Sequence, residues 1–235
     1  MKTLLSILLF LAIQPVCIAQ SDSICISHRV NLKKQTLKIF WKDDNNQPLR
    51  SIQNLKDWLE KKNETVLFAT NGGMYKTDNS PLGLFIESGQ TIVPINKTSA
   101  SGNFYLKPNG VFYFSKSEGA ICKTEDFKPD KNIMYATQSG PMLVINGSIH
   151  PEFKKGSANI NIRNGVGILP NGEILFAMSK SLISLYDFAE YFQQLGCKNA
   201  LYLDGFVSKI YLPQKNWLQT GGNFGVIIAE VTAGK

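Results

Sequence analysis

The chain has 235 residues and a formal net charge of +7 at pH 7. Its 43% hydrophobic and 18% charged residues exclude an intrinsically disordered protein, and its length suffices for one sizeable core. The lysines are scattered or stand in short pairs such as Lys33-Lys34 and Lys61-Lys62, which is typical of a solvated surface and not of a nucleic-acid groove. We therefore expect no nucleic-acid partner.

The N-terminal residues 1–19 are typical of a secretory signal peptide. A basic residue precedes an almost wholly apolar run over residues 4–13, and small residues lead to a cleavage site after Ala19. This run is too short to span a membrane, and Cys17 fits a lipidation motif poorly. We expect an exported protein, periplasmic or extracellular, in which residues 20–235 form one domain with no stable membrane span.

Cysteine and histidine chemistry is sparse. Three cysteines follow the expected cleavage site, so at most one disulfide can form. The two histidines and the lack of a CxxC pair predict no zinc site, and the sequence assigns no cofactor.

The first half of the chain alternates strands with one helix. Alternating apolar residues over 27–40 predict a hairpin of two strands, and helical spacing over 51–62 predicts an amphipathic helix. The apolar run 65–70 predicts a buried strand that ends at Asn71-Gly72-Gly73. Two glycines there allow a ligand to approach the backbone closely, although a plain turn is the alternative.

The middle of the chain is rich in short strands separated by Asn-Gly and Ser-Gly turns, which favours an antiparallel arrangement. The predicted strands of a meander are residues 84–86, 91–93, 104–106 and 111–114. Further on, an extended segment leads into Ser139-Gly140-Pro141, and Arg163-Asn164-Gly165 precedes another strand.

The last part of the chain carries the clearest helix. Ser184 is a good N-cap with Asp187 three residues later, and Gly196 is a stop signal. The apolar run 201–203 then predicts a buried strand that ends in Asp204. Together these elements predict an α+β fold: a single β-rich domain with a mixed, largely antiparallel sheet and a few packed helices.

Carboxylates are the natural acid and base, because histidines are few. Asp204 is the leading candidate, since a carboxylate at the end of a buried strand is held rigidly, and a turn aspartate is the alternative. A partner carboxylate would be Asp78 or Glu87, between which the sequence does not choose. Arg163 offers a planar fork for a phosphate or carboxylate, with a surface ion pair as its alternative role.

Four segments in this order resemble the phosphodiester glycosidase family: Asn71-Gly72-Gly73-Met74-Tyr75, Ser139-Gly140-Pro141-Met142-Leu143, Arg163-Asn164-Gly165-Val166-Gly167 and Leu203-Asp204-Gly205. The resemblance covers most of the chain after the expected signal peptide. It implies an exported hydrolase that cleaves a sugar from a sugar-phosphodiester and leaves the phosphate on the other partner.

The resemblance also implies roles for the matching residues. Asp204 and Arg163 would be catalytic, and the expected substrate-binding residues are Asn71, Gly72, Gly73, Ser139, Gly140, Asn164, Gly205 and Ser208. The family motif commonly continues after Asp-Gly with two further glycines, whereas Phe206 and Val207 stand here.

Two other functions compete with this one. Phe206 and Val207 leave open a non-catalytic protein that binds carbohydrate or an anion in the same pocket. A serine hydrolase would use Ser139 as nucleophile and the Gly72-Gly73 amides as an oxyanion hole, but the sequence shows no neighbouring base.

Overall fold

The computed structural model describes residues 23–204 and 207–232. The expected signal peptide and its cleavage site therefore lie outside the described residues. Across the described ranges, no helix is long and apolar enough to cross a membrane.

The molecule is built mainly of β-strands, and every pairing between the described strands is antiparallel. A six-stranded sheet has the order β1-β13-β12-β15-β9-β10, and two five-stranded sheets have the orders β17-β16-β3-β18-β2 and β5-β4-β8-β6-β7. A two-stranded ribbon pairs β11 with β14. The expected α+β character is broadly consistent with this architecture, but several antiparallel sheets replace the single mixed sheet.

The strand bounds are as follows: β1 Cys25–Val30, β2 Thr36–Phe40, β3 Val66–Asn71, β4 Phe85–Glu87, β5 Gln90–Val93, β6 Gly110–Phe114, β7 Gly119–Lys123, β8 Tyr135–Ser139, β9 Met142–Ile145, β10 Ser148–Ile149, β11 Ile160–Asn161, β12 Asn164–Ile168, β13 Ile174–Ser179, β14 Ile183–Ser184, β15 Ala200–Asp204, β16 Ile210–Leu212, β17 Trp217–Leu218 and β18 Ile227–Val231.

Two α-helices flank the sheets among the described residues. Helix α2 (Ile52–Glu60) begins after Ser51, whose hydroxyl accepts the Asn54 N–H. Helix α3 (Leu185–Gln194) begins after Ser184, whose Oγ accepts the Asp187 N–H and donates to the Asp187 carboxylate. The predicted cap of the second helix is therefore confirmed.

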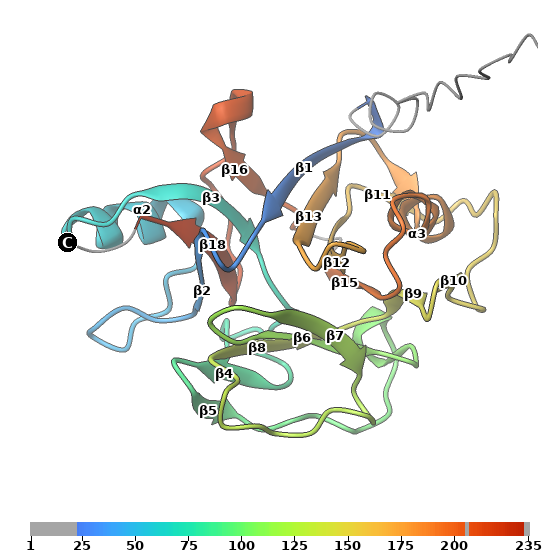
Figure 1. Ribbon diagram of the computed structural model, residues 1–235, viewed down its shortest axis with the longest axis horizontal. Helices are drawn as coiled ribbons and strands as arrows, with labels where there is room; N and C mark the ends of the chain where they lie inside the picture. Colours follow the sequence, from blue (N-terminus) through green and yellow to red (C-terminus); the bar gives the residue numbers. More distant parts are fainter. Residues whose placement is uncertain (1–22, 205–206, 233–235) are drawn as a thin grey trace, which may run out of the picture.

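The three large sheets share one core, in which aromatic rings from each sheet contact one another. Phe176 of β13 lies 5.2 Å from the Phe68 ring of β3 and 5.8 Å from the Phe112 ring of β6, measured between centroids. Each of these strands belongs to a different sheet (Figure 1). Burying such rings from three sheets against one another stabilises the assembly as a single domain.

Three sequence predictions of local structure are wrong. Residues 27–40 form two strands, but β1 pairs with β13 and β2 pairs with β18, so they separate into different sheets instead of forming a hairpin (Figure 1). Residues 104–106 are not a strand: Asn103–Tyr105 form a 3₁₀ turn, η1. The predicted meander is also interrupted, because β8 lies between β4 and β6.

Candidate functional site

Four of the segments that the sequence singled out meet at one place. Asn71 ends β3, Ser139 ends β8, Asn164 begins β12 and Asp204 ends β15. These strands come from all three large sheets. The ends of strands from three sheets therefore bring polar residues together that are up to 133 positions apart in the sequence (204 − 71).

Asn164 is the centre of this arrangement. Its Nδ2 lies 2.8 Å from the carbonyl oxygen of Asn71, 3.0 Å from Thr70 Oγ1 and 3.1 Å from Asn71 Oδ1. Its Oδ1 accepts the backbone N–H of Asp204 at 2.9 Å. One buried amide side chain thus joins the end of β3 to the end of β15.

Asn71 is buried, and one of its donors lacks a protein partner. Its Oδ1 accepts hydrogen bonds from Asn164 Nδ2 and from the Lys209 N–H at 2.9 Å. Its Nδ2 has no hydrogen-bond partner among the described residues, although the residue is only 1% exposed. A buried amide donor without a partner costs about 1–3 kcal/mol, so a bound group or water is the expected partner.

Asp204 is 8% exposed, and its backbone is held on both sides. Asn164 accepts its N–H, and the Ser208 hydroxyl lies 2.9 Å from its carbonyl oxygen. Its negative charge acts on two tyrosines. Burial raises the pKa of Tyr202 to about 12 and also raises the pKa of Tyr75, and the charge of Asp204 contributes to both shifts. Two neutral phenols therefore stand near this carboxylate.

Arg163 is fully buried, and its side chain contacts protein acceptors. Its Nε donates to the carbonyl oxygen of Ile183 at 2.8 Å, and its Nη1 donates to the Tyr202 hydroxyl at 3.0 Å. Its Nη2 lies 2.7 Å from Asn159 O and 3.1 Å from Asn159 Oδ1. Its expected role in binding a substrate anion stays a prediction, and these contacts favour a role in positioning.

Ser139 is also buried, and its hydroxyl donates to the carbonyl oxygen of Leu203 at 2.9 Å. The register between β12 and β15 shifts here: Asn164 is opposite Asp204, whereas Gly165 is opposite Tyr202. Leu203 is therefore the extra residue of a bulge, and Ser139 satisfies its carbonyl group. This contact gives Ser139 a structural task and does not favour the serine-hydrolase hypothesis.

The glycines of the site are needed for close packing. A Cβ atom on Gly72 would lie 2.6 Å from Val226 Cγ1, and the Gly72 N–H already donates to the Val226 carbonyl oxygen at 2.7 Å. A Cβ atom on Gly73 would overlap Thr137 of β8, and one on Gly140 would lie 2.6 Å from Asn109 Cβ. The double glycine therefore allows strands to pack closely, and its expected role in letting a ligand approach the backbone stays a prediction.

The two candidates for the second carboxylate, Asp78 and Glu87, lie in different surroundings. Asp78 is exposed and accepts hydrogen bonds from the N–H and hydroxyl of Ser80, which lower its pKa. Glu87 follows Ile86, which is opposite Ala136 on β8, so it lies about four residues, or about 13 Å, from Ser139 along that strand. Burial raises the pKa of Glu87 to about 7.

Some residues that the sequence placed near the site are not part of the hydrogen-bonded network described above. Other residues of that network were not predicted from the sequence. Gly205 and Phe206 lie outside the described residues, and Val207 packs against a core cluster that includes Phe40. Thr70, Tyr202 and the backbone of Lys209 were missed. Tyr202 sits two residues before Asp204 in an apolar strand, where a buried hydroxyl that needs a partner was the available signal.

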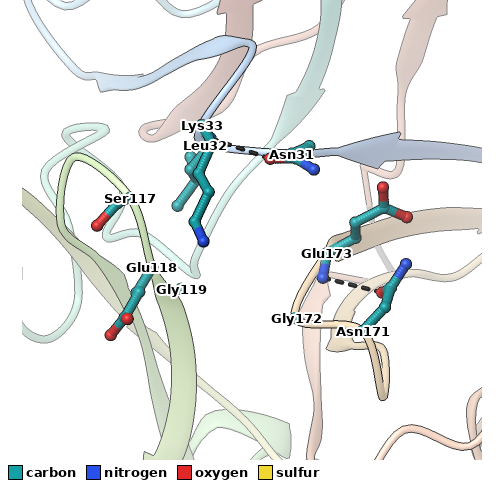
Figure 2. Close-up of a pocket in the computed structure, with 9 residues that line it drawn as sticks. All are labelled: Asn31, Leu32, Lys33, Ser117, Glu118, Gly119, Asn171, Gly172 and Glu173. Carbon is teal, nitrogen blue, oxygen red and sulfur yellow. Dashed lines mark hydrogen bonds between the residues drawn. The ribbon is translucent and has the colours of Figure 1, made fainter.

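The pocket in Figure 2 is a separate feature. It has a volume of about 360 Å³ and lies between three turns that carry Lys33, Glu118 and Glu173. The last of these turns follows β12, whose other end carries Asn164, so the pocket lies at the opposite end of that strand. Across the ranges that the structure describes, no group of three or more His, Cys, Asp and Glu side chains is placed to hold a metal ion.

Comparison with known proteins adds a family match, a related protein and two solved structures of similar fold. Residues 64–222 match the family model described as phosphodiester glycosidase. The chain is 36% identical over 215 residues to the uncharacterized protein YigE of Escherichia coli (strain K12). The alignment covers 88% of this chain and 84% of that protein.

The fold is similar to that of the zebrafish N-acetylglucosamine-1-phosphodiester alpha-N-acetylglucosaminidase catalytic domain, with a TM-score of 0.62 and 13% identity over 88% of this chain and 83% of that chain. It is also similar to a protein of Burkholderia pseudomallei K96243 that is named as a candidate exported protein, with a TM-score of 0.57 and 10% identity over 88% and 73% of the two chains. At these identities the two structures are evidence of the fold alone.

Proposed function

Because the chain belongs to the phosphodiester glycosidase family, we propose that it is an exported hydrolase that cleaves a sugar from a sugar-phosphodiester. The phosphate stays on the other partner. The zebrafish enzyme with a similar fold is named for N-acetylglucosamine 1-phosphodiesters, so this class supplies the first substrates to test.

One observation carries the proposal beyond family membership: a buried amide donor without a protein partner belongs to the same network as a strand-end carboxylate. Asn71 Nδ2 supplies the donor, and Asn164 links Asn71 to Asp204. A site that offers both a carboxylate and a fixed donor suits a substrate with hydroxyl groups and a phosphate.

We assign Asp204 the role of the base. A water molecule attacks the anomeric carbon, and its proton passes to the Asp204 carboxylate. The bond between the anomeric carbon and the phosphate oxygen breaks, and its electron pair leaves with the phosphate. The Asp204 carboxyl group then returns the proton to solvent, and Asn71 Nδ2 donates to a substrate oxygen throughout.

The leaving group explains why one carboxylate is enough. Glycoside cleavage commonly needs a second carboxylic acid, because an alkoxide is too basic to leave unprotonated. A phosphate monoester has a second pKa of about 6, so it leaves as a stable dianion at neutral pH. The distance of Glu87 and the exposure of Asp78 are consistent with this assignment.

The other residues of the site hold this geometry. Asn164 fixes the Asp204 N–H, Ser139 satisfies the bulge at Leu203, and Arg163 holds the Tyr202 hydroxyl. A non-catalytic carbohydrate-binding protein is the second candidate, and Phe206-Val207 in place of two glycines favours it.

The test follows release of free sugar from the methyl diester of N-acetylglucosamine 1-phosphate. We expect turnover by the wild type and a loss of about 10³-fold in kcat for Asp204→Asn, because the base is removed. Asp44→Asn is the matched control, since Asp44 pairs with Lys62 on the surface. Full activity of Asp204→Asn would refute the assignment of the base. Sugar binding without any turnover would favour the binding protein.

A further inference from the structure

A groove with a volume of about 530 Å³ lies along the outer edge of β7, away from the candidate site. β7 is the last strand of its five-stranded sheet, and residues 119–121 of this strand form one wall of the groove. Residues 168–170, at the end of β12 and in the turn after it, form the other wall, and residues 196, 198 and 199 complete the lining. Because Asn164 is at the opposite end of β12, a molecule in this groove leaves the candidate site open.

The backbone of β7 presents hydrogen-bonding groups to the groove. In an antiparallel pair, residues that exchange two hydrogen bonds alternate with residues that exchange none. At the turn between β6 and β7 the Ser115 N–H donates to the Glu118 carbonyl oxygen, so these two residues are a bonded pair. Counting from this pair along both strands, Phe112 and Ile121 are a non-bonded pair. The N–H and C=O groups of Ile121 therefore point away from β6, and those of Gly119 do the same.

One of the two Ile121 groups has a partner and the other has none. The Ile121 carbonyl oxygen accepts a hydrogen bond from Asn199 Nδ2 at 3.0 Å, which confirms its outward direction. Ile121 is only 4% exposed, and within the ranges that the structure describes no group accepts its N–H. A buried donor without a partner costs about 1–3 kcal/mol, so the expected acceptor comes from a bound molecule or water.

The side chains around this strand edge are apolar, with a single charge. Ile168, Leu169 and Pro170 line the groove opposite β7. Among the described lining residues, Lys198 is the one that carries a charge, and its side chain is exposed. The volume lies within the 300–1,000 Å³ that is typical of ligand-binding pockets. The groove therefore suits a molecule with an apolar body, main-chain-like acceptors and a negative charge.

The other edge of the same sheet provides a comparison. β5 lies at that edge, and its residues 90–92 are exposed, whereas Ile121 is buried beside the apolar wall. Water competes for the backbone groups of an exposed edge strand, so the β7 edge is the better template for another strand.

We propose that this groove binds a short extended segment of a protein partner, which adds a strand to β7 and places an acidic side chain beside Lys198. In such strand addition the main-chain hydrogen bonds supply affinity and the side-chain contacts supply specificity. Here the outward groups of Gly119 and the Ile121 N–H supply the main-chain bonds, the apolar wall contacts an aliphatic side chain, and Lys198 selects the acid. This binding is independent of the proposed hydrolase activity.

The experiment measures amide hydrogen exchange of the ¹⁵N-labelled protein by NMR, with the peptide acetyl-Glu-Val-Thr-Val-Glu-amide as the probe. Glutamate at both ends lets either strand direction place a carboxylate beside Lys198. At a peptide concentration of about ten times its dissociation constant, exchange of the Ile121 amide hydrogen should slow by about tenfold, because only the free protein exchanges there. The amides of β5 should be unaffected.

A charge reversal tests the role of Lys198. The wild type should bind the probe about fivefold more tightly than acetyl-Lys-Val-Thr-Val-Lys-amide, a difference typical of an exposed ion pair. Lys198→Glu should reverse this preference. Lys61→Glu is the matched control, since Lys61 is also exposed but lies at the end of α2, and this variant should keep the wild-type preference.

Four results would overturn the proposal. They are no binding of the probe at about 5 mM, unchanged exchange at Ile121 with the probe bound, protection of β5 in its place, and an unchanged preference in Lys198→Glu. Protection of Ile121 that rises with protein concentration in the absence of peptide would assign the edge to a second copy of this chain, and it too would contradict the proposal. Sugar release plays no part in these measurements, so the proposed hydrolase stands or fails separately.

Discussion

Asn164 Oδ1 accepts the backbone N–H of Asp204 at 2.9 Å, and this hydrogen bond fixes the end of β15 relative to β12. The two residues are opposite each other in the sheet, on the far side of the bulge at Leu203. Since the Nδ2 of the same amide binds the end of β3, the position of the Asp204 carboxylate depends on one side chain that touches two sheets.

We therefore predict that Asn164→Asp is both inactive and less stable. The substitution keeps the shape but removes the donor to Asn71 and Thr70, and it places a second carboxylate near Asp204. Loss of a buried donor within a network costs about 2–4 kcal/mol. Urea unfolding measures this loss, and sugar release should fall by at least about 100-fold.

Asn199→Asp is the control for this variant. Asn199 also uses its amide to join strands, through Ile121 O and the Asn146 N–H, but it lies away from the candidate site. It should lose stability and keep its kcat. Equal kcat in both variants would show that Asn164 does not orient the carboxylate.

The sequence was sufficient to find most of the residues that meet at this site, because polar residues at the ends of buried strands are a local signal. Asn71, Asn164 and Asp204 share hydrogen bonds as their positions suggested. It was not sufficient to show what Arg163 contacts. The guanidinium binds acceptors up to 39 residues away, and no local pattern reveals such partners.

Ser139→Ala should lower stability by about 1–2 kcal/mol, because the bulge carbonyl of Leu203 loses its donor. The exposed Ser117→Ala is the control, and thermal unfolding is the measurement. A serine-directed fluorophosphonate should leave Ser139 unlabelled, since its hydroxyl is buried. Labelling that disappears in Ser139→Ala would instead revive the serine-hydrolase hypothesis.

Gly72→Ala tests the packing role of the double glycine. The added methyl group would lie 2.6 Å from Val226 Cγ1 and 3.3 Å from Ile228 Cγ1, so β3 and the chain entering β18 must move apart. We expect a loss of about 1–3 kcal/mol in the free energy of unfolding. Gly221→Ala, with open space around the new Cβ atom, should be close to neutral.

Glu87→Gln should raise stability at alkaline pH and leave it unchanged at acid pH. Burial raises the pKa of Glu87 to about 7, above the value of about 4.3 in an unfolded chain. Between these two pH values the Glu87 carboxyl group therefore takes up a proton when the chain folds. The free energy of unfolding of the wild type consequently falls as the pH rises through this range. Melting temperatures of both proteins at pH 4 and pH 8 check this, and an equal difference at both pH values would contradict it.

The strand pairings could not be predicted from the sequence, and the N-terminal strands show why. The alternating pattern over residues 27–40 identifies strands, but it contains nothing about their partners. His28 of β1 stacks on Phe68 of β3, and its Nε2 lies 2.6 Å from the Glu230 carboxylate of β18. These contacts across about 40 and 202 positions, together with the pairing of β1 with β13 and of β2 with β18, override the local hairpin preference.

Hydrolysis in ¹⁸O-labelled water tests the central claim most directly, because it shows which bond breaks. The methyl diester of N-acetylglucosamine 1-phosphate is hydrolysed by the wild type, and the products are analysed by mass spectrometry. Attack at the anomeric carbon predicts the label in the free sugar and unlabelled methyl phosphate. Label in the methyl phosphate would mean that water attacks phosphorus, and it would contradict a phosphodiester glycosidase centred on Asp204.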